Sequence, residues 1–239
     1  MNRKLQLFLL VGFLFILEVT LFYNEYFYLN FLVKFLIGGL LIYFYRSQIQ
    51  GDLITSDKLF FTASVFGFLG EIGFMYPKTE VLTSVLVFVY LVEHQLYISL
   101  LRQPGYLNKN LSNFDLLRKG WPFILTAFLF FGFFLMEIVP DSIFVLMIFY
   151  VFQFAILGAY SLTLSKGSKG KVFIILGVVL IAISDILSSW YLFLGEFKFA
   201  YIIIRGIYIS SKFLLAYGFI LNLKRNQTDN LNHWDMGDK

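Results

Sequence analysis

Long apolar stretches separated by short polar connectors dominate the pattern of this chain. Eight stretches are each long enough to cross about 30 Å of hydrocarbon as a helix, and the longest connector covers only residues 103–119. The predicted spans are Leu5–Tyr23, Tyr28–Arg46, Lys58–Tyr76, Val81–Arg102, Gly120–Ile138, Ser142–Leu164, Lys171–Leu194 and Phe197–Leu223. We therefore predict an all-α fold, a polytopic membrane helix bundle with eight transmembrane helices. Residues 1–225 form a single domain in this interpretation, and residues 226–239 form a polar, frayed tail.

The first span has some features of a signal peptide, because Arg3 and Lys4 precede its apolar run. Glu18 interrupts the run and no small-residue cleavage site follows, so we interpret the segment as a retained first helix. With the N-terminus inside, fourteen Lys and Arg residues fall in the inner segments and two, Lys78 and Lys198, in the outer connectors. This asymmetry follows the positive-inside rule and predicts that both termini, and therefore the tail, are cytoplasmic.

Composition agrees with a membrane protein and excludes several classes. Of the 239 residues, 59% are hydrophobic and only 14% are charged, whereas soluble domains carry roughly 25% charged residues. We therefore expect an integral multi-pass membrane protein, in the plasma or inner membrane if the source is bacterial. A soluble enzyme, a secreted domain and a nucleic-acid-binding module are excluded. The chain has no cysteine, and His94 is its only histidine within a span, so we expect neither a metal site nor a cofactor.

Seven ionisable residues lie within the predicted spans, where each costs at least about 2.5–3.5 kcal/mol near the bilayer centre. They are Glu18, Lys34, Glu71, Glu93, Asp185, Arg205 and Lys212, and His94 lies beside Glu93. At a rise of about 1.5 Å per residue, these groups fall between the outer third and the middle of the membrane. Since lipid cannot accept them, they must face one another or water.

Helical phase supports a shared cavity, because the polar residues of each span recur at intervals that place them on one face. The sets are Tyr90, Glu93, His94 and Tyr97; Tyr201, Arg205, Tyr208 and Lys212; Asp185, Ser188 and Ser189; and Ser64, Gly67 and Glu71. The alternative is that such groups form structural ion pairs that hold helices together, and Glu93 suits that role best because it could pair with Lys212. Taken together, the residues favour a functional polar cavity.

Four short motifs fall on the same residues. The second span contains Lys34-Phe35-Leu36, the third Gly70-Glu71, the fourth His94-Gln95-Leu96-Tyr97, and the seventh Ile183-Ser184-Asp185. In this order they resemble the Lys-Pro-Leu, Gly-Asp, His-x-x-Tyr and Ser-Asp motifs of the lysoplasmalogenase-like YhhN family of eight-span membrane proteins. The resemblance extends over residues 5–223. The chain departs from the family pattern at Phe35 in place of proline, at Glu71 in place of aspartate, and at Lys212, which stands near an expected glutamine.

The resemblance implies a membrane-embedded hydrolase that cleaves the vinyl ether bond of lysoplasmalogens and releases a fatty aldehyde and a glycerophospho-alcohol. Such chemistry needs one carboxyl group to protonate the alkene carbon and another to balance the resulting cation and accept a proton from water. We expect Glu71 and Asp185 to be this catalytic pair, without assigning which is the acid. The expected supporting residues are His94, Tyr97 and Ser184, the expected phosphate-binding residues are Lys34 and Arg205, and the other expected cavity residues are Glu18, Glu93, Tyr208 and Lys212.

Two other functions remain open from the residues alone. A non-enzymatic lipid-binding or transport protein could use the same cavity, although only four prolines are present and one, Pro122, lies within a span. A retinal protein is suggested by Lys212 in the last span, but eight spans rather than seven argue against it. In the enzymatic reading the binding partner is a membrane lipid or lysophospholipid and not a nucleic acid.

Overall fold

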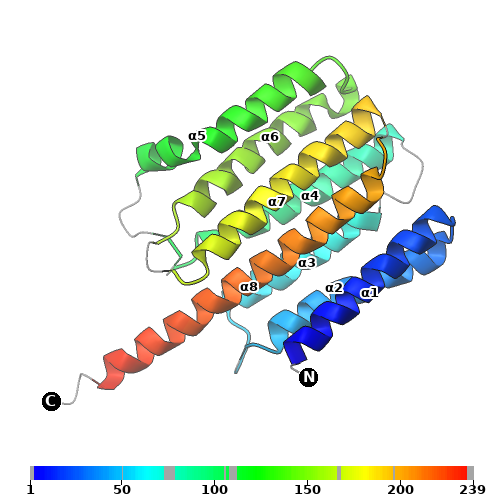
Figure 1. Ribbon diagram of the computed structural model, residues 1–239. Helices are drawn as coiled ribbons and strands as arrows, with labels where there is room; N and C mark the ends of the chain where they lie inside the picture. Colours follow the sequence, from blue (N-terminus) through cyan, green and yellow to red (C-terminus); the bar gives the residue numbers. More distant parts are fainter. Residues whose placement is uncertain are drawn as a thin grey trace.

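The structure, a computed structural model, describes residues 3–49, 51–72, 79–104, 106–107, 112–165, 168–195 and 197–235. It is a bundle of helices in an up-and-down arrangement (Figure 1). The helices are α1 (Arg3–Tyr23), α2 (Phe27–Arg46), α3 (Thr55–Ile72), α4 (Glu80–Leu101), α5 (Asn113–Phe130), α6 (Asp141–Leu162), α7 (Lys171–Ser189) and α8 (Ala200–Asp235). The helices α5 and α7 each continue into a π-helical turn, Phe131–Leu135 and Trp190–Leu194. Within the described residues there is no strand, only an isolated bridge between Leu107 and Leu164.

The all-α prediction is confirmed, and most helix ends lie within a few residues of the predicted spans. Seven of the helices are long and apolar enough to cross a membrane, consistent with an integral multi-pass membrane protein. The exception is α3, whose 18 residues include Asp57, Lys58 and Glu71. The predicted end of that span, residues 73–76, lies outside the described residues, so the count of eight spans stays a prediction.

The last helix differs from the expectation. Its apolar span, Ala200–Asn222, agrees with the sequence, but α8 then continues to Asp235 where a frayed tail was expected. No proline or glycine occurs between residues 224 and 235, so nothing in the local sequence interrupts the helix before Gly237.

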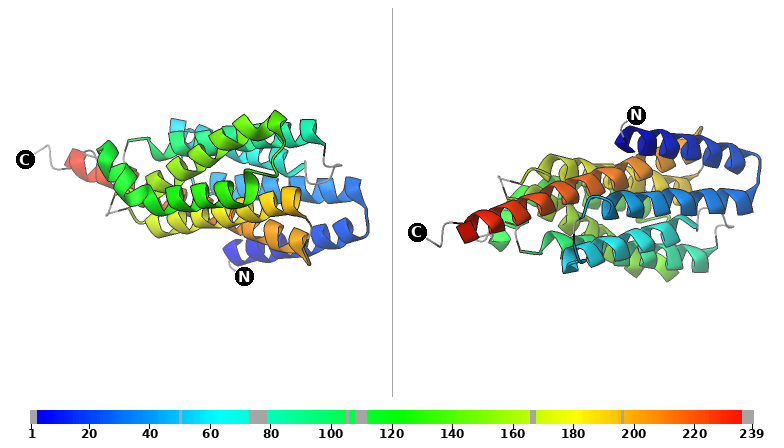
Figure 2. Two further views of the ribbon diagram at one scale, coloured as in Figure 1. Left: turned by 90° about the horizontal axis from the view of Figure 1, so that it is seen from above. Right: turned by 90° about the horizontal axis from the view of Figure 1, so that it is seen from below.

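The order of helices in space places α4 and α8 where they can meet several neighbours. The helix α4 packs against α3 and α6, and α8 packs against α7, α2 and α1. The first helix lies at the periphery and contacts mainly α2 (Figure 2). The start of α1 and the end of α8 are at the same end of the bundle (Figure 1), as an even number of passes requires.

Local sequence explains several helix starts. Thr79 accepts a hydrogen bond from the Leu82 amide at the start of α4, and Ser112 accepts one from the Asp115 amide at the start of α5. Asp57 in the first turn of α3 accepts one from the Ile54 amide. These side chains satisfy amides that have no partner within the helix. The outward faces are apolar, with Phe13, Phe133 and other large side chains more than half exposed, as contact with lipid requires.

Candidate functional site

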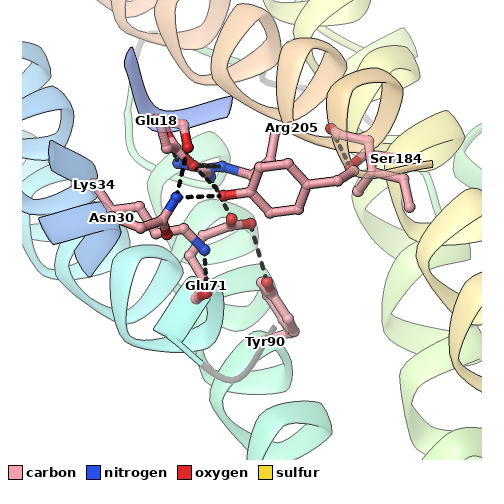
Figure 3. Close-up of polar contacts among 9 residues, drawn as sticks. Glu18, Asn30, Lys34, Glu71, Tyr90, Ser184 and Arg205 are labelled. Atoms are coloured by element: carbon pink, nitrogen blue, oxygen red, sulfur yellow. Dashed lines mark hydrogen bonds and ion pairs between the residues drawn. The ribbon is translucent and has the colours of Figure 1, made fainter. Parts of the chain in front are cut away.

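Arg205 of α8 is the centre of a polar cluster that also contains Glu18, Lys34 and Glu71 (Figure 3). We call it the outer cluster. The Arg205 side chain is buried, with 1% of its surface exposed. Its Nε and Nη2 atoms donate to the two carboxylate oxygens of Glu18 at 2.6 and 3.0 Å, and its Nη1 donates to Oε2 of Glu71. Both carboxylates are themselves buried. One guanidinium group therefore connects α1, α3 and α8, using the planar fork that suits Arg to such pairs.

The second cation of this cluster, Lys34 of α2, has a different kind of partner. Its ammonium group donates to the backbone carbonyl of Glu71 at 3.0 Å and lies 5.4 Å from the centre of the Tyr201 ring. Among the described residues, no carboxylate lies within ion-pair distance of it. Asn30, one turn earlier on α2, donates to the Glu18 carbonyl at 2.7 Å, and Tyr201 donates to the Glu18 carboxylate at 2.7 Å. Lys34 is thus the cation with the fewest anionic contacts.

A second cluster lies deeper in the bundle, where Lys212 of α8 pairs with Glu93 of α4. The Lys212 ammonium lies 4.4 Å from the centre of the Tyr208 ring and 5.0 Å from that of Tyr97. The backbone of Gly67 approaches this pair closely, since an added Cβ would stand 2.5 Å from both Glu93 Oε1 and Tyr208 Oη. The pair anticipated as structural is therefore present, and α3 can pack against it only because residue 67 has no side chain.

Asp185 of α7 stands apart from these ion pairs. Its Oδ2 atom lies 3.5 Å from Nε2 of His94, and no Lys or Arg of the described chain is within ion-pair distance of its carboxylate. Its side chain is 12% exposed, against 2% for Glu71. It also lines two pockets, one of about 370 Å³ between α5, α6 and α7 and one of about 450 Å³ between α4, α6 and α7, both counted as empty space out to the rim. Asp185 is thus partly buried and lines both of these pockets, whereas the fully buried carboxylates Glu18, Glu71 and Glu93 line neither.

Tyr90 of α4 connects Glu71 to the pockets. Its hydroxyl donates to Oε1 of Glu71 at 3.2 Å, on the side of the carboxylate opposite Arg205. Tyr90 also lines the larger pocket together with Asp185. Glu71 itself lines neither pocket, so a molecule bound there would meet Asp185 and Tyr90 before it met Glu71.

Comparison with known proteins gives a family match that covers nearly all of the residues described above. A sequence profile of the YhhN family matches residues 29–219, from the second helix to the last. The chain belongs to the YhhN family. No curated protein and no solved structure was found to match it. The YhhN match includes all four motifs and every residue of both clusters except Glu18, because α1 precedes its first residue.

The structure distributes the expected YhhN site residues over three adjoining groups instead of one cavity. Glu18, Lys34, Glu71 and Arg205 meet in the outer cluster, whereas His94 contacts Asp185, which lines the pockets. Glu93, Tyr97, Tyr208 and Lys212 form the deeper cluster. Ser184 points to α8, where its hydroxyl lies 3.4 Å from the Ile204 carbonyl (Figure 3). This contact holds two helices together and does not reach the Asp185 carboxylate.

Four residues near these groups were not among the expected YhhN site residues. Helical phase had placed Tyr90 and Tyr201 on the polar faces of their helices but had given them no role. Asn30 lies one turn before Lys34 on α2 and was detectable by the same spacing. Tyr150 of α6, whose ring centre is 5.1 Å from that of His94, had no such signal because its helix contains no charged residue after Asp141. No group of three or more potential metal ligands occurs among the described residues.

Proposed function

We propose that this YhhN protein hydrolyses the vinyl ether bond of lysoplasmalogen-type lysophospholipids, with Asp185 as the proton donor. The observation that carries the proposal is the position of Asp185. It is a partly buried carboxyl group that borders two pockets and has His94, instead of a Lys or Arg, within ion-pair distance. A carboxyl group that must deliver a proton to carbon needs access to the substrate and freedom from a permanent cation.

The reaction begins with transfer of the Asp185 proton to the alkene carbon that is not bonded to oxygen. The double bond supplies the electron pair for the new C–H bond, and the adjacent ether oxygen shares the resulting positive charge as an oxocarbenium ion. The ionised Asp185 stabilises that charge across the pocket. Water then adds to the carbon next to oxygen, and its released proton returns to Asp185. The hemiacetal collapses to a fatty aldehyde and a glycerophospho-alcohol, so the net change is consumption of one water.

The neighbouring residues take supporting parts. His94 positions the Asp185 carboxyl group through the 3.5 Å contact. Glu71 acts through Tyr90, which stands between it and the pocket, and fixes the orientation of the Tyr90 hydroxyl. We assign the lipid phosphate to Lys34 because Arg205 already donates to Glu18 and Glu71. Arg205 is then a positioning residue that fixes Glu71.

The test is turnover by the purified protein of a lysoplasmalogen, compared with its ester and alkyl ether analogues. Asp185→Asn keeps the shape of the side chain but cannot deliver a carboxylic proton, so the rate should fall at least about a hundredfold. Asp141→Asn is the matched control, because Asp141 is exposed at the start of α6, and it should keep the wild-type rate. Full activity of Asp185→Asn would show that the acid is another residue.

Two further variants separate the roles of Glu71 and Tyr90. If Glu71 acts through Tyr90, then Tyr90→Phe and Glu71→Gln should lower the rate by similar factors, and the double variant should be little worse than either. Independent losses that multiply would contradict this coupling. A wild-type protein that binds the lysolipid yet cleaves none of the three analogues would favour a lipid-binding or transport function.

A further inference from the structure

The pocket between α5, α6 and α7 has a lining that the reaction alone does not require. Apart from Asp185, Ser189 and the Tyr150 hydroxyl, its walls are hydrocarbon and aromatic side chains. Ala127 of α5 and Ala182 of α7 both line it, and both belong to the apolar core between these helices. Two small side chains among Phe130, Phe154 and other large ones leave the space open.

The pocket extends to both sides of Asp185 along the bundle axis. On α7, Ala182 lies about one turn before Asp185 and Ser189 about one turn after it, a separation of roughly 10 Å at 1.5 Å per residue. On α6, which runs in the opposite direction, Met147 and Phe154 span a similar length. The lining of the pocket therefore continues about one helical turn to either side of Asp185, and the carboxyl group lies near the middle of that length.

The second pocket adjoins the first and has more polar groups in its lining. Met147, Tyr150, Asp185 and Ser189 line both pockets, so the two are adjacent. The second one adds the Tyr90 and Ser188 hydroxyls and reaches Leu192 and Phe193 in the π-helical turn that follows α7. The π-helical turn that follows α5 contributes Leu135 to the first pocket. Such turns occur frequently at functional sites, since they redirect side chains out of the regular helical order.

We propose that the pocket between α5, α6 and α7 binds the hydrocarbon chain of the substrate, with the chain running from Asp185 inward past Ala182. This rests on the proposed function for the nature of the lipid, but the occupant follows from the lining: a single unbranched aliphatic chain suits an apolar lining that continues along the helices to either side of one carboxyl group. The glycerol end then lies in the second pocket, among the hydroxyls of Tyr90 and Ser188. Ala127 and Ala182 determine how long a chain is accepted beyond the reacting bond.

The first test changes the room available to the chain. Ala182→Phe fills the inner part of the pocket, so the ratio of kcat/KM for long-chain over short-chain vinyl ethers should fall at least tenfold. Ala182→Val should give a smaller shift in the same direction. Ile183→Phe is the matched control: Ile183 is adjacent but 40% exposed, so added bulk there faces outward and should leave the ratio unchanged. Retained cleavage of the short-chain substrate shows that each variant is folded.

The second test needs no turnover. A non-cleavable alkyl ether lysophospholipid with a diazirine near the end of its chain is photolysed with the full-length protein, and the labelled peptides are identified by mass spectrometry. Label should appear on α5, α6 and α7 in wild type and be reduced by Ala182→Phe but not by Ile183→Phe. The competing site is the apolar groove between α2 and α3, lined by Phe35, Gly38 and Phe68.

The two tests separate the chain site from the reaction. Label on α5, α6 and α7 without cleavage of any vinyl ether supports the chain site and overturns the proposed function. Cleavage with label on α2 and α3, or with the same chain-length ratio in Ala182→Phe and wild type, overturns the chain site and leaves the proposed function standing.

Discussion

Removal of the Arg205 side chain should destabilise the protein more than any other change of a single charge in the bundle. The variant Arg205→Met keeps a long apolar side chain but leaves the carboxylates of Glu18 and Glu71 without their cation. Both carboxylates are at most 2% exposed, so water cannot replace the lost hydrogen bonds. In this state the cluster keeps two carboxylates and one cation, Lys34, so the bundle must either hold an uncompensated negative charge or protonate a carboxylate.

The magnitude follows from the contacts. Arg205 donates three hydrogen bonds to carboxylates, and each bond of this kind contributes about 1.5–3 kcal/mol. Breaking a buried ion pair by removing one partner costs about 3–5 kcal/mol. For a domain of this size, such a loss lowers the unfolding temperature by roughly 6–20 °C. An exposed ion pair contributes about 0–1 kcal/mol. The variant Arg118→Met, which breaks the exposed pair with Asp115, should therefore lower the unfolding temperature by only a few degrees.

The assay is thermal unfolding of the purified protein in one detergent, followed by tryptophan fluorescence and circular dichroism. A double variant, Arg205→Met with Glu18→Gln, removes one charge of each sign and leaves Lys34 with Glu71. It should recover at least half of the lost stability, because a set of side chains of similar shape and zero net charge can replace a buried ion pair at little cost. The reasoning would be refuted if Arg205→Met unfolded within 2 °C of wild type, or if the double variant were less stable than the single one.

Three further predictions concern topology, packing and the diverged carboxylate. Tags at both termini should report the cytoplasmic side, and protease protection that differs between the two ends would mean an odd number of spans. Gly67→Leu should prevent assembly or strongly lower the unfolding temperature because its Cβ would meet Glu93 and Tyr208 at 2.5 Å, whereas Gly39→Leu, with nothing within 4 Å of its Cβ position, should melt like wild type. Glu71→Asp should keep lysoplasmalogen turnover within about tenfold of wild type, because a carboxylate remains near Tyr90; a loss as large as that of Glu71→Gln would show that this position needs the longer side chain.

Which charges pair with one another could not be predicted from the sequence. Helical phase placed Tyr201, Arg205, Tyr208 and Lys212 correctly on the buried face of α8, and it suggested the pair of Glu93 with Lys212. Helical phase could not show that Arg205 pairs with both Glu18 and Glu71, or that Lys34 donates to a backbone carbonyl. Periodicity specifies which side of a helix faces inward, whereas pairing depends on the rotation and height of two helices relative to each other.

The sequence by itself determined the membrane class, the positions of the helices and the faces that carry polar groups. These follow from local rules, because a span must be apolar over its whole length and a buried charge must face inward. Only the tertiary structure decided that Asp185 borders open space while Glu71 lies behind Tyr90. The pocket between α5, α6 and α7 also exists only in the tertiary structure. It is the space left between Met147, Tyr150 and Phe154 of α6 and the small side chains of Ala127 and Ala182. Empty space is a property of three packed surfaces, and no single helix encodes it.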